Sequence, residues 1–298
     1  MVGAPEGVRP TRRGAVKVLV TGAGGQLGQD LMVAFAGDDV FAASHRSLDV
    51  TDRDQVLGAI TTTRPDIVVH TAAWTAVDAC ETDPDRAFAV NALGSRHVAE
   101  ACARAGSHLC AISTDYVFDG TATTPYREWD ATNPLGEYGR SKLAGEREIL
   151  GLVPAASIVR TSWLCGAGGA NFVKTMMRLA TASKDPVRVV DDQHGCPTFT
   201  ADLAGAIRVL AVARRPGLFH VTNQGPTTWW GFARAVFDGV GADPERVVAI
   251  RTAELDPPRA APRPLYSVLD NAALRLSGLP LLADHREPLE RLIKELSS

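Results

Sequence analysis

The sequence lacks several features that would assign it to a class of protein at once. No apolar run approaches the ~20 residues that a membrane-spanning helix needs. The 31 Lys and Arg do not exceed the 34 Asp and Glu, so the net charge is −3, whereas nucleic-acid-binding domains carry a basic excess. The five cysteines form no C-x-x-C pair, which argues against a zinc site and suits buried thiols in a reducing compartment. We therefore expect a cytoplasmic protein that binds neither nucleic acid nor membranes.

The composition is that of a folded globular chain. Hydrophobic residues make up 45% of the 298 residues and charged residues 22%, both near the globular average. Short β-branched runs alternate with longer segments of helical periodicity, which is typical of a parallel sheet wrapped by helices on both faces. Strands are expected at 16–20, 40–43, 67–70, 109–113 and 157–160, and helices at 25–36, 51–62, 83–105 and 138–150.

The alternation of strands and helices becomes less regular after Thr161. Four prolines between Pro257 and Pro264 predict a loop. We expect a flexible N-terminal tail at 1–15, a dinucleotide-binding domain mainly at 16–161, and a smaller α/β lobe mainly at 162–298 that is interleaved with it. In that lobe, helices are expected at 171–182, 201–213, 228–239 and 287–296, and strands at 187–190, 218–221 and 247–250.

A glycine-rich turn joins the first strand to the first helix. Gly22, Gly25 and Gly28 form G-x-x-G-x-x-G in that place. Glycine permits a tight turn and lets the backbone approach a pyrophosphate, while the helix N-terminus offers free N–H groups. Because the strand–turn–helix context is met, the turn predicts a Rossmann-type doubly wound fold that binds NAD or NADP.

The end of the second strand bears on the choice of cofactor. NAD-binding folds place a carboxylate there for the ribose 2′-hydroxyl, but this chain has Ser44, His45 and Arg46. Arg46 could pair with a 2′-phosphate, which favours NADPH or tolerance of both cofactors, or it is a solvated loop charge. Asp49 could accept a hydrogen bond from the adenine amino group, or serve as an N-terminal charge for the following helix.

A tyrosine–lysine pair predicts the chemistry. Tyr138 and Lys142 are four residues apart on a predicted helix, so both project from one face. An ammonium beside a phenol lowers the pKa of the tyrosine and makes it a usable general acid. Thr114 follows the fourth strand, at the sheet edge where ligands bind, and its hydroxyl can hydrogen-bond a carbonyl oxygen while Tyr138 protonates it.

Taken together, these motifs resemble the extended short-chain dehydrogenase/reductase superfamily. Further segments resemble one family within it, the dTDP-4-dehydrorhamnose reductases, and they occur in order from Val16 to about Leu269. These segments are Thr75–Asp78, Ser113–Gly120, Pro134–Gly139, Arg160–Trp163, Asn171–Met176 and Asp192–Thr198. Two others, His70–Ala73 and Asn91–Gly94, resemble the cofactor-facing loop and the start of the long central helix of the superfamily as a whole.

The resemblance implies reduction of the C4 ketone of dTDP-4-dehydro-L-rhamnose to dTDP-L-rhamnose by NADPH or NADH, with Tyr138, Lys142 and Thr114 as the catalytic residues. The cofactor-binding residues implied, besides Tyr138 and Lys142, are Gly22, Gly25, Gln26, Leu27, Gly28, Asp49, Val50, Ala72, Ala73, Trp74 and Thr75. The substrate-binding residues implied are Thr114, Asp115, Trp163, Asn171 and Arg263, the last two for the nucleotide diphosphate. The resemblance also admits a homodimer and a Mg²⁺ ion held by carboxylates between subunits, although the sequence shows no local metal-ligand spacing.

Two departures from related enzymes shape this prediction. Sugar-nucleotide 4,6-dehydratases carry a glutamate as base where this chain has Tyr116, so elimination is disfavoured and carbonyl reduction remains. Trp74 stands where members of the reductase family often carry a smaller polar or histidine side chain. Trp229 and Trp230 either pack the second lobe, the interpretation we favour, or stack on a nucleobase.

Two other functions stay open from the sequence. One is a reductase or epimerase of another nucleotide sugar, because the pocket residues alone fix neither base nor sugar. The other is a non-catalytic regulatory subunit of the same fold, since fold alone cannot exclude it. The presence of Thr114, Tyr138 and Lys142 favours an enzyme, because a binding protein needs no proton donor beside a lysine.

Overall fold

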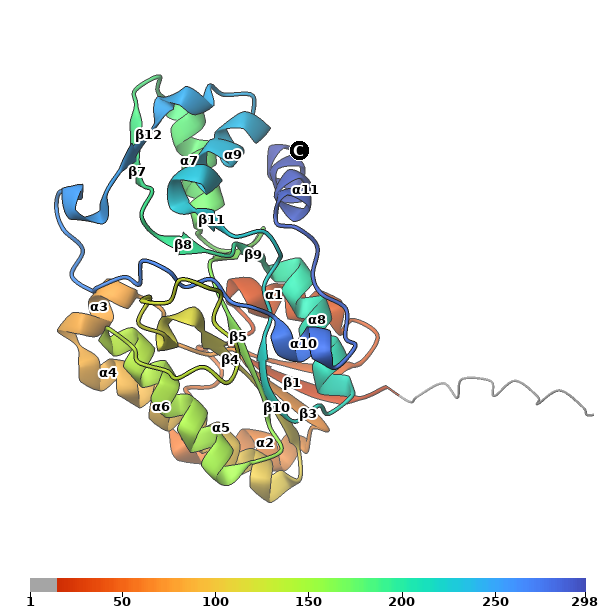
Figure 1. The fold of residues 1–298 in the computed structure, drawn as a ribbon. Helices are drawn as coiled ribbons and strands as arrows, with labels where there is room; N and C mark the ends of the chain where they lie inside the picture. The colour runs from red at the N-terminus through yellow and green to blue at the C-terminus, as the bar shows by residue number, and fades with distance from the viewer. Residues whose placement is uncertain (1–14) are drawn as a thin grey trace, which may run out of the picture.

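A six-stranded parallel sheet forms the centre of the larger part of the molecule. The computed structural model describes residues 15–298, so the tail expected at 1–15 lies, except for Ala15, outside the described residues. The strand order is β10-β5-β4-β3-β1-β2, and every neighbouring pair is parallel (Figure 1). The strands are β1 (Lys17–Thr21), β2 (Asp39–Ala43), β3 (Ile67–His70), β4 (His108–Thr114), β5 (Ser157–Thr161) and β10 (Gly217–His220). The predicted doubly wound α/β fold is confirmed.

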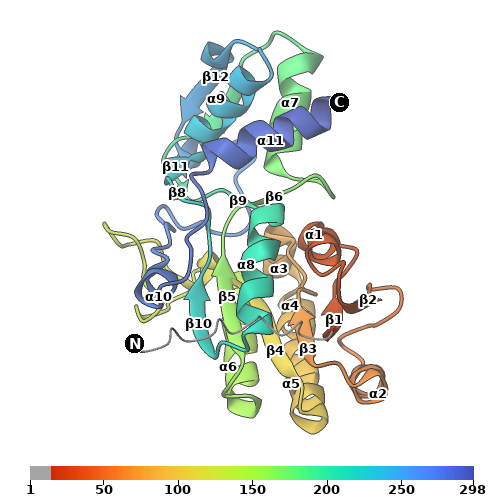
Figure 2. The ribbon, with the colours of Figure 1, turned by 90° about the vertical axis from the view of Figure 1, so that its right-hand side faces the viewer.

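Helices cover both faces of this sheet, as the buried inner strands require. On one face, Leu27 and Leu31 of α1 (Gln26–Ala34) pack with Leu203 and Ile207 of α8 (Thr200–Val212) against β1 and β3. The other face is covered by α2 (Arg53–Thr63), α5 (Gly94–Ala105) and α6 (Glu137–Leu152). Figure 2 shows α8 crossing in front of the sheet and α6 behind it.

A smaller lobe stands beyond the carboxyl ends of the strands (Figures 1 and 2). Its core, built on Phe232 and Phe237, joins α7 (Phe172–Ala182), α9 (Trp229–Gly239) and α11 (Arg286–Ser297) to a parallel pair, β7 (Val187–Val190) and β12 (Val247–Ile250). Two short pairs link the lobe to the sheet: β6 (Leu164–Cys165) with β9 (Thr198–Phe199), and β8 (His194–Gly195) with β11 (Thr227–Thr228).

The chain passes more than once between the two parts. After α7 and β7 it returns to the large sheet through α8 and β10, and α10 (Ala272–Leu276) packs on β10 before α11 re-enters the lobe. The predicted division of the chain at Thr161 into two interleaved domains stays a prediction. Within residues 15–298, no helix combines the length and the apolar character needed to cross a membrane.

The long helix predicted at 83–105 is interrupted. It begins as α4 (Pro84–Phe88), capped by the Asp83 carboxylate, which accepts from Arg86 N at 3.2 Å. It then passes through a π-helical turn at Ala89–Leu93 before α5. A further helix, α3 (Val77–Thr82), was not predicted. The π turn adds one residue to a helical turn, and the 3.6-residue pattern of apolar residues does not reveal such an insertion.

Candidate active site

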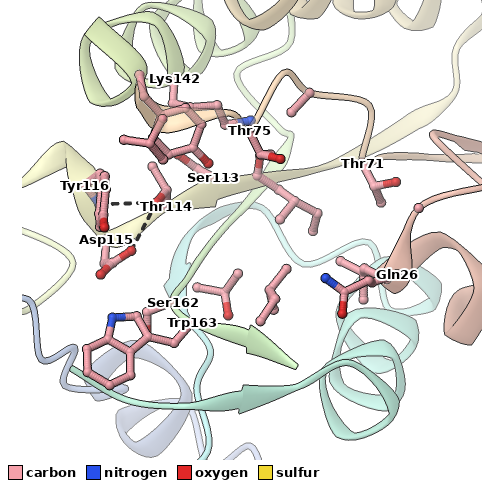
Figure 3. Close-up of a pocket in the computed structure, with 18 of the residues that line it drawn as sticks. Gln26, Thr71, Thr75, Ser113, Thr114, Asp115, Tyr116, Lys142, Ser162 and Trp163 are labelled. Atoms are coloured by element: carbon pink, nitrogen blue, oxygen red, sulfur yellow. Dashed lines mark hydrogen bonds between the residues drawn. The ribbon is translucent and has the colours of Figure 1, made fainter. Parts of the chain in front are cut away.

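A cavity of about 370 Å³ opens at the carboxyl ends of β1, β3, β4 and β5. Gln26 and Thr71 lie at one end of it, and Asp115 and Trp163 at the other (Figure 3). Both parts of the molecule contribute to its wall. The lining residues are Gly22, Gly25, Gln26, Leu27, Gly28, Thr71, Ala73, Thr75, Val77, Ile112, Ser113, Thr114, Asp115, Tyr116, Tyr138, Lys142, Thr161, Ser162, Trp163, Leu164 and Trp229.

The glycine-rich turn has the geometry of a phosphate cradle. Gly22 has φ +71°, and a Cβ there would lie 2.7 Å from Ala72 N. A Cβ on Gly28 would lie 2.4 Å from Gly22 O. Gly25 is the N-cap of α1 and supplies no side-chain cap, so N–H groups of the first turn of α1 are free for an anion.

The three predicted catalytic residues converge on this cavity. Thr114, at the end of β4, donates through Oγ1 to Asp115 Oδ1 at 3.0 Å and accepts from Tyr116 N at 3.2 Å (Figure 3). Tyr138 and Lys142 reach it from α6, and Lys142 Nζ donates to Ile112 O at 2.7 Å. The Tyr138 ring meets the Tyr116 ring edge-on, with the centroids 5.8 Å apart.

Burial determines the protonation of Tyr138 and Lys142. It raises the pKa of Tyr138, with the Thr114 hydroxyl acting in the opposite direction. Burial also lowers the pKa of Lys142 to about 8, against the influence of the Glu146 carboxylate. The net shift of the pKa of Tyr138 is therefore upward, because burial of the phenolate is the largest influence on it, and the lowering of this pKa by Lys142 stays a prediction. The phenol is protonated at neutral pH, which is the form that a proton donor needs.

A buried carboxyl group forms the far wall. Asp115 is 2% exposed, and burial raises its pKa to about 6 although Ser267 and Thr114 donate hydrogen bonds to it. Asp115 therefore presents a carboxyl group to the cavity beside Thr114, within reach of a polar ligand.

The loop after β3 contributes only in part as predicted. Ala73 and Thr75 line the cavity, but Ala72 and Trp74 do not. The Trp74 ring lies under the Arg86 guanidinium, 4.6 Å from it. Asn91, in the π turn, accepts from Trp74 N at 2.8 Å and donates to Trp74 O at 3.1 Å. Asn91 thus fixes the Trp74 backbone, while the indole packs on α4.

Asp49 and Val50, predicted for the adenine end, lie outside the cavity wall. The Asp49 carboxylate accepts from Thr51 N at 2.9 Å and Thr51 Oγ1 at 2.8 Å, which lowers its pKa. Val50 is buried, and its Cγ2 would lie 2.9 Å from a Cβ on Gly94. The cap of α2 is Asp52 instead, so Asp49 is engaged in a local turn.

A second cavity, of about 520 Å³, adjoins the first and shares Tyr116 and Trp229 with it. Arg263 lies there beside Arg259, and it donates from both terminal nitrogens to Asp78 at 3.0 and 2.8 Å. The other lining residues are Phe172, Thr175, Met176, Leu179, Val187, Arg188, Val189, Val190, Gln193 and Leu255.

Asn171 lines neither cavity. It is the N-cap of α7, accepting from Lys174 N at 3.1 Å, and its Nδ2 donates to Gln26 Oε1 at 2.9 Å. The side chain therefore ties the smaller lobe to the glycine-rich turn.

Sequence reasoning missed the role of Trp229 as a cavity wall. Its ring stacks on Trp163 with the centroids 3.6 Å apart and an angle of 9°, and it borders both cavities. Trp230 packs as expected and donates to Val247 O at 2.9 Å. The sequence signal that could have revealed this role is the N-cap Thr228, which accepts from Gly231 N. Because α9 begins at Trp229, this cap determines that Trp229 faces the cavities and that Trp230 packs inside the lobe.

Comparison with known proteins supports the assignment of these motifs. The family model described as "RmlD substrate binding domain" matches residues 16–298. The dTDP-4-dehydrorhamnose reductase of Streptomyces griseus is 47% identical over 279 residues, which cover 91% of each chain. The chain belongs to the dTDP-4-dehydrorhamnose reductase family.

A solved structure and a relative named for a different reductase activity are also similar to this chain. The crystal structure of dTDP-4-dehydrorhamnose reductase from Bacillus anthracis in complex with NADP has a TM-score of 0.90 and 39% identity, covering 94% of this chain and 99% of that chain. A dTDP-4-keto-6-deoxy-D-glucose reductase of Streptomyces niveus is 42% identical over 264 residues, 88% of this chain and 91% of that relative.

The geometry of the site fits a bound dinucleotide, independently of the comparison with relatives. The cradle of glycines would be filled by a Cβ at Gly22 or Gly28. In the described part of the chain, Thr161 Oγ1 is buried without a hydrogen-bond partner, and Thr161 lines the cavity. A ligand hydroxyl or amide could supply that partner. Among residues 15–298, no three His, Cys, Asp or Glu side chains gather as a metal site would require.

Proposed function

We propose that this protein reduces the C4 ketone of dTDP-4-dehydro-L-rhamnose with NADPH or NADH and releases dTDP-L-rhamnose. The observation that carries the proposal is the convergence of Thr114, Tyr138 and Lys142 on one cavity, opposite the glycine cradle, in a chain of this family. A positioned proton donor at a sheet edge, next to a dinucleotide cradle, is what carbonyl reduction requires.

The cofactor residues follow from the cavity. The N–H groups of Gln26 and Leu27 are placed against the pyrophosphate, whereas the N–H of Gly25 donates to Gly22 O at 2.9 Å and shapes the turn. Ala73 and Thr75 border the nicotinamide end. Lys142 binds the ribose hydroxyls through its ammonium. The bound cofactor supplies a hydride to the ketone carbon. Asp49 and Val50 remain proposed for the adenine end, as the resemblance implies.

The chain's own residues manage the proton. On substrate binding, the Thr114 hydroxyl exchanges its hydrogen bond to Asp115 for one to the ketone oxygen, and so aligns this oxygen with the Tyr138 hydroxyl. Tyr138 then donates its proton to the oxygen as negative charge develops there. The Lys142 ammonium stabilises the phenolate that remains. Because burial keeps the phenol protonated, the donor is ready before the reaction starts.

The substrate spans the two cavities. Asp115 and Trp163 contact the sugar in the first cavity, and Arg263 faces the diphosphate from the second. Trp229 borders both and is placed against the sugar–nucleotide junction. The Asn171 side chain donates to Gln26 at 2.9 Å and so supports the glycine-rich turn. Its direct contact with the nucleotide, which the resemblance implies, stays a prediction.

Three alternatives differ in what supports them. The relative named as a dTDP-4-keto-6-deoxy-D-glucose reductase supports a second substrate, a stereoisomeric 4-keto sugar on the same nucleotide. Elimination has no support, because a buried Tyr116 with a raised pKa stands where a dehydratase base would be. A regulatory subunit leaves the proton donor beside Lys142 unexplained.

Three further expectations accompany this proposal. A cytoplasmic location is supported by five buried, unpaired thiols at Cys80, Cys102, Cys110, Cys165 and Cys196. A homodimer and a Mg²⁺ ion remain implied by the resemblance alone, and the proposed steps use neither.

The test is cofactor consumption. Purified protein is mixed with NADPH or NADH and with dTDP-4-dehydro-L-rhamnose generated in situ, and the nicotinamide absorbance is followed. Substrate-dependent oxidation is expected with at least one cofactor. Tight cofactor binding without oxidation would refute the proposed substrate, and the stereoisomeric 4-keto sugar is then the matched second substrate.

A further inference from the structure

A doubly buried ion pair lies beside the candidate catalytic residues. Arg160, on β5, donates from Nε to Glu146 Oε1 at 2.9 Å and from Nη2 to Oε2 at 2.7 Å. Both side chains are 5% exposed, whereas every other ion pair among residues 15–298 has a partner more than a third exposed. Burying two charges is costly compared with apolar packing, so this pair needs an explanation other than stability.

The carboxylate of Glu146 is bonded to the strand that carries Thr114. Ser113 Oγ donates to Glu146 Oε1 at 2.5 Å, and Ser113 is the register partner of Arg160 across β4 and β5. Register partners leave a parallel sheet on the same face. Glu146 therefore clamps the ends of two strands to α6 at the residue next to Thr114.

The same carboxylate lies one helical turn from Lys142. Tyr138, Lys142 and Glu146 are spaced four residues apart and share one face of α6. A cavity of about 10 Å³, room for one water, is lined by both Lys142 and Glu146. Neither Glu146 nor Arg160 lines the substrate cavity, so neither can touch the reacting atoms.

The charged surroundings of Lys142 single out Glu146. From β3, His70 faces the ammonium, but its pKa is lowered to about 3 by burial and by Lys142 itself, so it is neutral. Tyr138, on the same helix, is protonated. Glu146 is the acidic group that opposes the desolvation of Lys142, and two hydrogen bonds from Arg160 hold its carboxyl group in place.

We propose that Glu146, held by Arg160, is a positioning residue that keeps Lys142 charged and fixes the end of β4 beside it. The inference rests on the proposed function, in which the Lys142 ammonium is required. It assigns the buried pair to the chemistry rather than to folding.

The test is the pH profile of kcat/KM for Glu146→Gln. Loss of the carboxylate lets burial act on Lys142 unopposed, so the alkaline limb should move to lower pH by about one unit. The expected loss of kcat/KM is about fivefold at about pH 8, approaches about tenfold at higher pH, and is small below about pH 6. A purely structural role would lower kcat/KM equally at all pH values and would overturn the inference. The matched control is Glu148→Gln on the same helix, which breaks only an exposed pair with Arg96 and should leave the limb in place.

A second variant guards against misfolding. Glu146→Gln leaves the buried Arg160 charge without a partner, whereas the double change Glu146→Gln/Arg160→Gln removes both charges. The double variant should show the same shift of the alkaline limb. A folded double variant with the wild-type limb would overturn the inference.

Failure of the proposed function is distinguishable from failure of this inference. NADPH affinity, read from nucleotide fluorescence, should fall as the pH rises through about 8, the pKa of Lys142, and at lower pH in the Glu146 variants. If the wild type binds NADPH in this way but oxidises none, the proposed substrate is wrong and the role of Glu146 stands. If the wild type turns over and both pH profiles of the variants match it, only the role of Glu146 is refuted.

Discussion

Replacing Tyr138 with phenylalanine removes one oxygen atom and little else. The aromatic ring and its edge-on contact with Tyr116 are retained. The cavity therefore keeps its shape. What is lost is the proton donor. General acid catalysis contributes about 10²- to 10⁴-fold to rate, equivalent to about 3–5 kcal/mol of the barrier. The two other groups that could replace it are poor donors: Thr114 is an alcohol, and Asp115, with a pKa of about 6, is mostly ionised at neutral pH.

The assay measures kcat by cofactor oxidation and the Kd for NADPH by fluorescence titration. For Tyr138→Phe, kcat should fall by about 10²- to 10⁴-fold, while the Kd changes by less than about threefold, since the assigned ribose contact is that of Lys142. The matched control is Tyr126→Phe. Tyr126 is buried, its hydroxyl donates to Asp119 at 2.9 Å, and it does not line the cavity. This control change should cost about 1 kcal/mol of unfolding free energy and leave kcat unchanged. Unchanged turnover in Tyr138→Phe would remove this residue from the mechanism.

Three other changes test separate parts of the site. Lys142→Ala should lower kcat and weaken NADPH binding together, and an unchanged Kd for NADPH in this variant would refute the ribose contact. The activity of the wild type should decline as the pH rises through about 8, where the Lys142 ammonium loses its proton. Gly28→Ala places a Cβ 2.4 Å from Gly22 O and should raise the Kd of both cofactors roughly tenfold or more, with Gly58→Ala, where a Cβ meets nothing within 4 Å, as the control. Arg46→Ser should reduce the preference for NADPH over NADH, measured as the ratio of the two kcat/KM values, and an unchanged ratio would make Arg46 a solvated loop charge.

Much of the fold could be predicted because the relevant signals are local. The β-branched runs marked each strand of the central sheet within one or two residues of its observed ends. Gly22, Gly25 and Gly28 identified the cradle from their place between a strand and a helix. Tyr138 and Lys142 needed only the four-residue spacing of a helix. Each of these inferences depends on residues close together in the chain.

What could not be predicted depends on residues that are distant in sequence. Trp163 and Trp229 come from different elements, and only the folded lobe stacks them. Arg263 meets Asp78 across 185 residues. The direction in which Trp74 points follows from Asn91, whose position depends on the π turn.

The protonation of the site was the least predictable property. The sequence places an ammonium near the phenol, which predicts a lowered pKa for Tyr138. The structure adds desolvation by the surrounding chain, which raises the pKa of Tyr138. Desolvation depends on the whole surrounding chain, so a two-residue motif cannot report it.

Transfer of a labelled hydride tests the central claim most directly. The protein is incubated with NADPH carrying deuterium on the transferred position of the nicotinamide and with dTDP-4-dehydro-L-rhamnose, and the product is examined by NMR. The account predicts one deuterium at C4 of a dTDP-rhamnose for each cofactor oxidised. Cofactor oxidation with no deuterium in the sugar, or deuterium at another carbon, would contradict it.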